Sequence, residues 1–149
     1  MNETTTPLET IEQVVHIDAA PETVWSFWTE PARLCEWWGI EADAVAATGG
    51  VFRVVMEAGP VMLGEFLELD PPRRLLFSFG WEGGAPGGAL PPGSSRVEVV
   101  LDDQAGGTRL TLRHELPATH AVDHAKGWSF YVGDRLVDVA RATPRSVGS

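Results

Sequence analysis

Two histidines, a tyrosine and an arginine are the residues of this chain best suited to acid–base chemistry. His114 falls on the inward face of an expected strand, and His124 lies one helical turn before Trp128. Histidine changes its charge near neutral pH, so His114 and His124 could move protons together with Tyr131 or Arg53. The alternative is that each histidine is held by structural hydrogen bonds or lies in water at a rim. We therefore assign no catalytic residue.

Motifs for metal or nucleotide chemistry are missing from the sequence. His120 and His124 are spaced i, i+4 but have no HExxH context, and Cys35 is the single cysteine, which excludes a cysteine-based zinc site and an internal disulfide. The sequence also contains no nucleophile elbow, P-loop or GxGxxG motif. We expect neither a metal nor a cofactor.

Aromatic residues form the strongest pattern. The chain has six tryptophans, six phenylalanines and one tyrosine, and most of them fall on expected inner faces. Each can bury about 150–250 Å². This pattern fits either a large packed core or the lining of an apolar pocket.

The elements that would position these side chains are mostly short strands. Alternating apolar residues and intervening turn residues favour an antiparallel meander. Strands are expected at residues 11–17, 42–47, 51–57, 62–69, 75–81, 95–101 and 108–114. The inward phase of Glu65 and Phe66 stays open, because Gly64 could form a bulge. The segment 82–93, EGGAPGGALPPG, is expected to be a loop and a candidate lid.

Helices are expected on both sides of the meander. Pro21 and Pro31 each suit the first position of a helix, so two short helices should follow the first strand, the second ending at Gly39. Apolar residues at helical spacing predict a long final helix over about 119–142, with Pro144 beyond its end. This helix is the one long apolar partner available to the sheet.

The overall charge restricts the partners. The formal net charge is −10, Lys126 is the only lysine, and no basic run occurs. Such a chain is poorly suited to nucleic acid or to an anionic membrane. The chain has no apolar run long enough to span a membrane and no basic, apolar leader at residues 1–10, so a cytoplasmic protein is expected.

Several segments, in order along most of the chain, resemble a known family. They are APETVW at 20–25, TEP at 29–31, WWG at 37–39, GGVFRV at 49–54, GEFLELDPPRRLLFSFGWEG at 64–83, GGTRLTLRHEL at 106–116 and HAKGW at 124–128. The sequence is similar in these segments to the AHSA-type family (activator of heat-shock protein 90 ATPase homologue-like) of the START and birch-pollen-allergen superfamily, also called SRPBCC.

The resemblance implies an α+β helix-grip fold, in which a curved antiparallel sheet of six to seven strands wraps a long C-terminal helix around a cavity. It further implies a hydrophobic small molecule or lipid-like ligand in that cavity. The alternatives are a polyketide cyclase or dehydratase-like enzyme using the same cavity, and a chaperone ATPase activator. The expected ligand-binding residues are Trp25, Trp28, Trp38, Phe52, Val54, Phe66, Phe77, Phe79, Trp81, Val97, Val99, Leu112, His114, His124, Trp128 and Tyr131.

The domain organisation follows from the same pattern. We expect a flexible lead-in at 1–9, a single domain at 10–143 and a flexible tail at 144–149. The domain should bind no nucleic acid, should not insert into a membrane, and should be a monomer or a homodimer.

Overall fold

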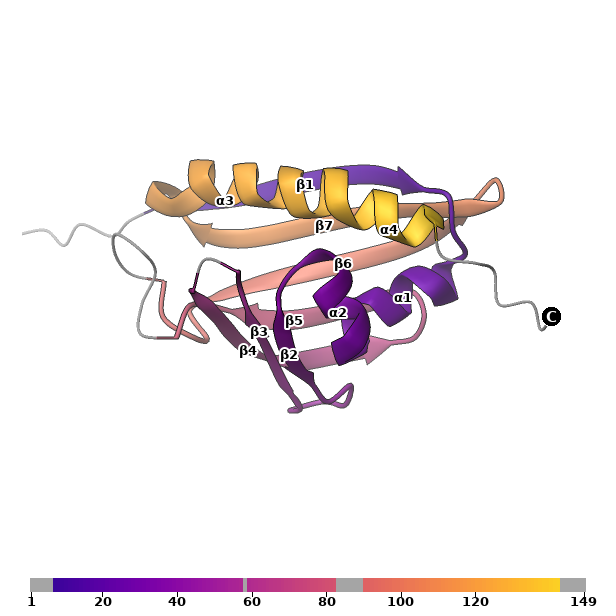
Figure 1. Ribbon diagram of the computed structural model, residues 1–149. Helices are drawn as coiled ribbons and strands as arrows, with labels where there is room; N and C mark the ends of the chain where they lie inside the picture. Colours follow the sequence, from indigo (N-terminus) through magenta and orange to yellow (C-terminus); the bar gives the residue numbers. More distant parts are fainter. Residues whose placement is uncertain (1–6, 58, 83–89, 143–149) are drawn as a thin grey trace, which may run out of the picture.

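A seven-stranded antiparallel sheet and a long C-terminal helix make up most of the molecule (Figure 1). This computed structural model describes residues 7–57, 59–82 and 90–142. The strands are β1 (Leu8–Ile17), β2 (Glu41–Ala44), β3 (Val51–Val55), β4 (Val61–Asp70), β5 (Arg74–Phe79), β6 (Ser95–Gln104) and β7 (Gly107–Pro117). The helices are α1 (Pro21–Thr29), α2 (Pro31–Trp37), a 3₁₀ turn η1 (Ala118–His120), α3 (Ala121–Trp128), a π-helical segment η2 (Ser129–Leu136) and α4 (Val137–Ala142).

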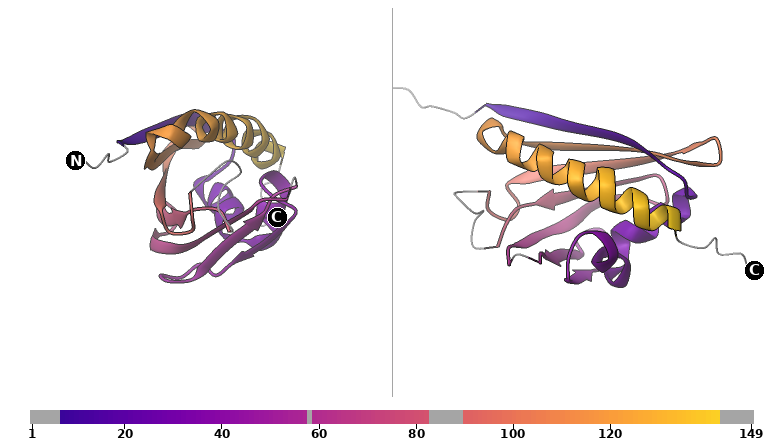
Figure 2. Two further views of the ribbon diagram at one scale, coloured as in Figure 1. Left: turned by 90° about the vertical axis from the view of Figure 1, so that its left-hand side faces the viewer. Right: turned by 45° about the horizontal axis from the view of Figure 1, so that its top comes forward.

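The sheet is an antiparallel meander except for its first strand, which pairs with the last strand. Its order is β1-β7-β6-β5-β4-β3-β2, so β2 to β7 follow one another while β1 pairs with β7 at the edge. The register of β4 shifts between Phe66 and Glu68, and such bulges increase local twist. Viewed end-on, the sheet curls and the C-terminal helix lies across its open side (Figure 2, left). This is the helix-grip arrangement predicted from the sequence.

The two short helices are separated at Glu30. This residue is extended, with φ −106° and ψ 125°, and it is both the C-cap of α1 and the N-cap of α2. Proline at the next position disfavours helical geometry at Glu30, while Pro21 and Pro31 each begin a helix. The bent pair predicted from the two prolines is confirmed.

The hairpin between β6 and β7 is tighter than predicted. The strands expected at 95–101 and 108–114 leave six residues between them, but β6 continues to Gln104 and β7 begins at Gly107. Ala105 and Gly106 have φ values of 46° and 84°, which suits a two-residue turn between twisted strands. The sequence did not predict this extension of β6 because Asp102 and Asp103 have low strand propensity.

The open question of strand phase in β4 is settled by burial. Phe66 is fully buried and Glu65 is exposed. The register shift lies after Phe66 rather than at Gly64. Gly64 instead allows a close approach to β5, since a Cβ at this position would lie 1.8 Å from the carbonyl oxygen of Ser78.

The C-terminal helix is continuous but not uniform. Residues 121–128 and 137–142 are α-helical, whereas Ser129–Leu136 form a π-helical segment. Sequence periodicity predicts an uninterrupted helix over about 119–142 and contains no signal for i→i+5 bonding. The helix lies beside β1 and reaches α1 and α2 (Figure 1). None of the helices in the described residues is long and apolar enough to cross a membrane.

Some predictions fall on segments outside the described residues. These include positions 1–6 of the expected lead-in, 83–89 of the expected lid and the whole expected tail at 144–149. The base of the lid segment is described: Trp81 N–H donates to the carbonyl oxygen of Leu90 at 2.7 Å, and Leu90 is buried. At the other end of the chain, β1 begins at Leu8, three residues before the expected start.

Candidate functional site

A pocket of about 240 Å³ opens between the C-terminal helix and one end of the sheet. Its walls come from the end of α2, the end of β3, the end of β5 and one face of the C-terminal helix. The lining residues are Trp38, Met56, Phe79, Trp81, His120, Asp123, His124, Gly127, Trp128 and Tyr131. The lining therefore combines five aromatic rings with two histidines and one carboxylate.

Helical spacing places the lining residues of the C-terminal helix side by side, and these residues form the upper wall of the pocket. Residues 120, 123, 124, 127, 128 and 131 repeat at i, i+3 and i+4 intervals, which places them on one face of the helix. On the sheet side, which forms the lower wall, Phe79 and Trp81 are two positions apart and therefore point to the same face. Trp81 also forms an isolated β-bridge with Met62. This bridge keeps Trp81 beside the sheet after β5 has ended.

The rings of the lining pack against one another at one side of the pocket. The ring centroid of Trp128 lies 5.3 Å from that of Trp38 and 5.7 Å from that of Phe79. Trp81 meets Phe79 edge to face at 5.5 Å. These separations lie in the favourable range for aromatic pairs, so the rings of the wall stabilise one another.

His114 is fully buried behind this wall and is not part of the lining. Trp128 Nε1 donates a hydrogen bond of 3.0 Å to His114 Nδ1. Ser95 Oγ donates to the carbonyl oxygen of Phe79 at 2.8 Å, so Oγ accepts from His114 Nε2 at 2.9 Å. Burial, and then the nearby His124, lower the pKa of His114 to about 3. The ring is neutral at physiological pH.

His124 faces the pocket, but both of its ring nitrogens are engaged. Trp81 Nε1 donates to His124 Nε2 at 3.1 Å, and His124 Nδ1 donates to the carbonyl oxygen of His120 at 2.8 Å. Burial lowers the pKa of His124, against the opposing effects of the His120 carbonyl and of Asp123. The indole N–H opposite Nε2 further disfavours a second ring proton, because indole can only donate.

The other polar candidates lie away from the lining. Arg53 is 3.9 Å from Asp43 and 3.6 Å from Glu82, measured between ion-pair atoms. Glu65 is exposed on β4. Among the described residues, no group of three or more histidine, cysteine, aspartate or glutamate side chains could hold a metal ion.

Six of the sixteen expected site residues line the pocket: Trp38, Phe79, Trp81, His124, Trp128 and Tyr131. The other ten lie outside the lining, nine of them in the buried core: Trp28, Phe52, Val54, Phe66, Phe77, Val97, Val99, Leu112 and His114. Trp25 is half-buried on α1. The core rings interlock, as Phe52 shows by stacking on Phe66 at 4.6 Å and meeting Phe77 edge to face at 4.7 Å.

Sequence reasoning missed four lining residues, namely Met56, His120, Asp123 and Gly127. Signals for all four were present. Met56 shares the inward face of Phe52 and Val54 by alternation, and the other three lie on the helix face of His124 and Trp128.

The curved sheet closed by a C-terminal helix, with a pocket between them, defines the helix-grip class of proteins. The sequence matches the family described as "Activator of Hsp90 ATPase homolog 1-like protein" over residues 18–141, and the chain belongs to this family. A comparison with curated protein sequences found no significant match.

Solved structures support this assignment. The chain is 34% identical to an AHSA1-like protein from Rhizobium etli, covering 99% of this chain and 91% of that one with a TM-score of 0.73. It is 27% identical to DynU16, a protein of the dynemicin biosynthetic locus, covering 87% of this chain and 46% of that one with a TM-score of 0.73. The chain thus spans about half the length of DynU16. It shares the fold of the Aha1 dimer from Colwellia psychrerythraea at 18% identity, covering 89% and 96% of the two chains with a TM-score of 0.70.

Proposed function

We propose that this protein binds a small, largely apolar molecule in the pocket beneath its C-terminal helix. The observation that carries the proposal is the lining itself, in which five aromatic rings and Met56 surround the space while polar groups gather on one helix face. Ligand pockets in proteins typically combine apolar walls with a few placed polar groups.

The size of the pocket restricts the ligand. An apolar cavity of about 150 Å³ accepts benzene, whereas drug-sized ligands occupy pockets of about 300–1,000 Å³. The pocket of about 240 Å³ lies between these values. It suits a compact molecule with a few fused rings or a short isoprenoid better than a full-length lipid.

The experiment follows from the three tryptophans in the wall. Titration with lipids, aromatic polyketides and isoprenoids should change the tryptophan emission for at least one class, because Trp38, Trp81 and Trp128 line the space. Mass spectrometry of the natively purified protein should identify a co-purifying compound of the same class. Unchanged emission with every class, together with protein free of bound compounds, would contradict the proposal.

A cyclase or dehydratase-like enzyme is the second candidate, and its support is the similarity to DynU16 from a biosynthetic locus. The geometry restricts which residues could act. Both nitrogens of His114 and His124 are hydrogen-bonded, so acid–base steps would depend on Tyr131, His120 and Asp123 in the lining. Turnover of an aromatic polyketide that is lost in Tyr131→Phe and His120→Gln would favour this candidate over simple binding.

Chaperone ATPase activation is suggested by the description of the family. It would act through the surface of the protein rather than through the pocket. An ATPase assay with a bacterial chaperone of the Hsp90 type tests it, and an unchanged rate would remove it.

A further inference from the structure

The charged groups around the pocket are unequally distributed. Among the described residues, Asp123 is the one formally charged member of the lining, and no lysine or arginine belongs to it. His120, His124 and the hydroxyl group of Tyr131 are further polar groups of the lining, and the two hydrogen bonds of His124 favour its neutral form. A ligand in this pocket therefore lies beside a carboxylate without a fixed positive charge to balance it.

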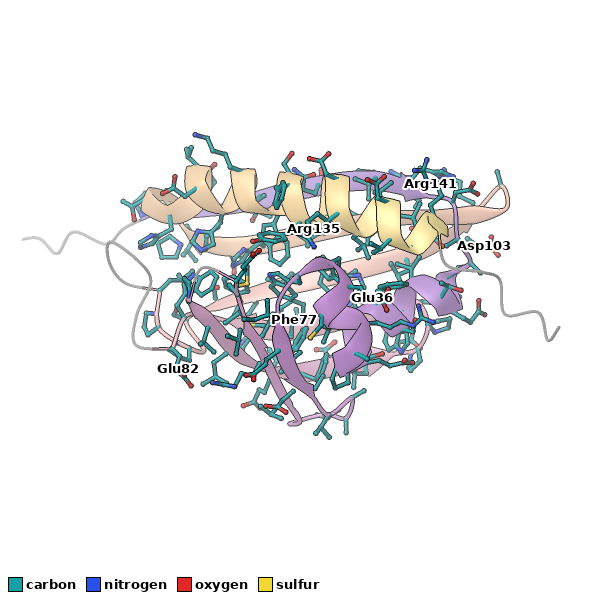
Figure 3. The ribbon with its side chains drawn as sticks, in the orientation of Figure 1. Glu36, Phe77, Glu82, Asp103, Arg135 and Arg141 are labelled. Carbon is teal, nitrogen blue, oxygen red and sulfur yellow. The ribbon has the colours of Figure 1, made fainter. Side chains whose placement is uncertain are left out.

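In the described part of the chain, the lysine and arginine side chains of neighbouring elements do not belong to the lining. Lys126 is exposed and is not part of the lining. Arg53 is shared between the carboxylates of Asp43 and Glu82, so this group of three has a net negative charge. In Figure 3, Glu82 lies at the end of the molecule where α3 begins, whereas Arg135 and Arg141 lie further along the helix.

The aromatic walls, like the Asp123 carboxylate, favour a positively charged ligand. Aromatic ring faces attract cations through their quadrupole, and tryptophan does so most strongly. Three of the five rings in the lining are tryptophans. A fatty acid or another carboxylate would instead place its charge against these faces and near Asp123, which disfavours its binding. Asp123 is exposed, so solvent reduces the size of this repulsion but does not change its sign.

We propose that the pocket selects aromatic ligands bearing an ammonium group over matched carboxylates, with the ammonium group beside Asp123 and the tryptophan faces. This inference rests on the proposed function, because it specifies the ligand class of the same pocket.

The test uses three probes of nearly equal size that differ in charge: 2-(1-naphthyl)ethylammonium, 2-(1-naphthyl)ethanol and 1-naphthylacetate. Their affinities are measured by calorimetry at low salt and pH 7.5. We expect the ammonium probe to bind about tenfold more tightly than the carboxylate, with the alcohol between them. Asp123→Asn should reduce this ratio at least by half, because it removes the carboxylate while retaining its size.

Asp134→Asn is the matched control, since Asp134 is an exposed aspartate on the same helix outside the lining. It changes the net charge equally and should leave the ratio intact. Binding of the alcohol without preference between the charged probes would overturn the selectivity alone, and so would an unchanged ratio in Asp123→Asn. Failure of all three probes to bind the wild-type protein would overturn the proposed function and the selectivity with it.

Discussion

Trp128 and His114 connect the pocket wall to the sheet through one buried hydrogen bond, with 3.0 Å between Nε1 and Nδ1. Trp128 presents its ring to the pocket, while His114 belongs to β7 and passes the connection on to Ser95 of β6. The helix that covers the pocket is thus fixed to the sheet by polar as well as apolar contacts. Loss of this bond should loosen the wall.

Replacement of the buried histidine should be strongly destabilising. His114→Ala creates a cavity and leaves the Trp128 N–H without its acceptor, so we expect a loss of about 3 kcal/mol or more in unfolding free energy. Ser95→Ala removes a smaller group and should cost about 1–2 kcal/mol. Urea denaturation monitored by tryptophan emission measures both. A loss below 1 kcal/mol in His114→Ala would contradict the buried network.

The stability of the protein should decrease as pH falls. The pKa of His114 is lowered to about 3 in the folded protein, whereas the unfolded chain takes up this proton near the ordinary value of 6.5. The stability contributed by His114 is therefore complete above about pH 6.5 and is lost progressively towards pH 3, by at most about 1.4 kcal/mol per pH unit. The pKa of His124 is lowered as well, so its contribution has the same sign.

Urea denaturation at pH 7.5, 6.5, 5.5 and 4.5 measures this dependence. His114→Gln, which retains an acceptor and a donor but cannot be protonated, should show a flatter profile. The control is His16→Gln on the exposed face of β1, and its profile should match that of the wild type. Equal slopes in all three proteins would show that His114 is not the group responsible.

Trp81 should control the protonation of His124. In Trp81→Phe the indole donor to Nε2 is lost while an aromatic ring remains, so the pKa of His124 should rise. NMR titration of the imidazole resonances measures this shift. The wild-type protein, titrated under the same conditions, is the reference. A pKa of His124 that stays the same or falls would contradict the assigned hydrogen bond.

Gly64 should tolerate no side chain, because β4 and β5 approach closely there. A Cβ at this position would lie 1.8 Å from the carbonyl oxygen of Ser78, and backbone cannot move aside as a flexible side chain can. Gly64→Ala should therefore lower the unfolding free energy by about 2 kcal/mol or more. Gly133→Ala, where nothing lies closer than 3.9 Å to the added Cβ, should be neutral or stabilising. Similar stabilities of the two variants would contradict the register of β4 and β5.

The fold was predictable because its signals are local. Alternation identified the inward faces of β3 and β7, and Pro21 and Pro31 marked the starts of α1 and α2. The division of inward residues between core and pocket was not predictable. Phe52 and Phe79 have equivalent patterns in the sequence, but Phe52 stacks within the core while Phe79 reaches the lining.

The remaining features depend on contacts that are distant in the sequence. The hydrogen bonds of His114 and His124 come from tryptophans 14 and 43 positions away, so no local pattern indicates that these rings are neutral and fully engaged. The π-helical segment around Tyr131 also has no periodic signature in its apolar residues.

The claim that the pocket receives a ligand is tested most directly by filling it from Gly127. An added Cβ at this lining position meets no atom within 4 Å, so Gly127→Leu should fold normally while occupying the space. Gly133→Leu is the matched control outside the lining, where the nearest atoms to the added Cβ are Ser129 Oγ at 3.9 Å and Gln13 Oε1 at 4.0 Å. Calorimetric titration with 2-(1-naphthyl)ethanol should give equal affinities for the wild type and Gly133→Leu, and an affinity about tenfold or more weaker for Gly127→Leu. Equal binding by all three proteins, or no binding by the wild type, would contradict the account.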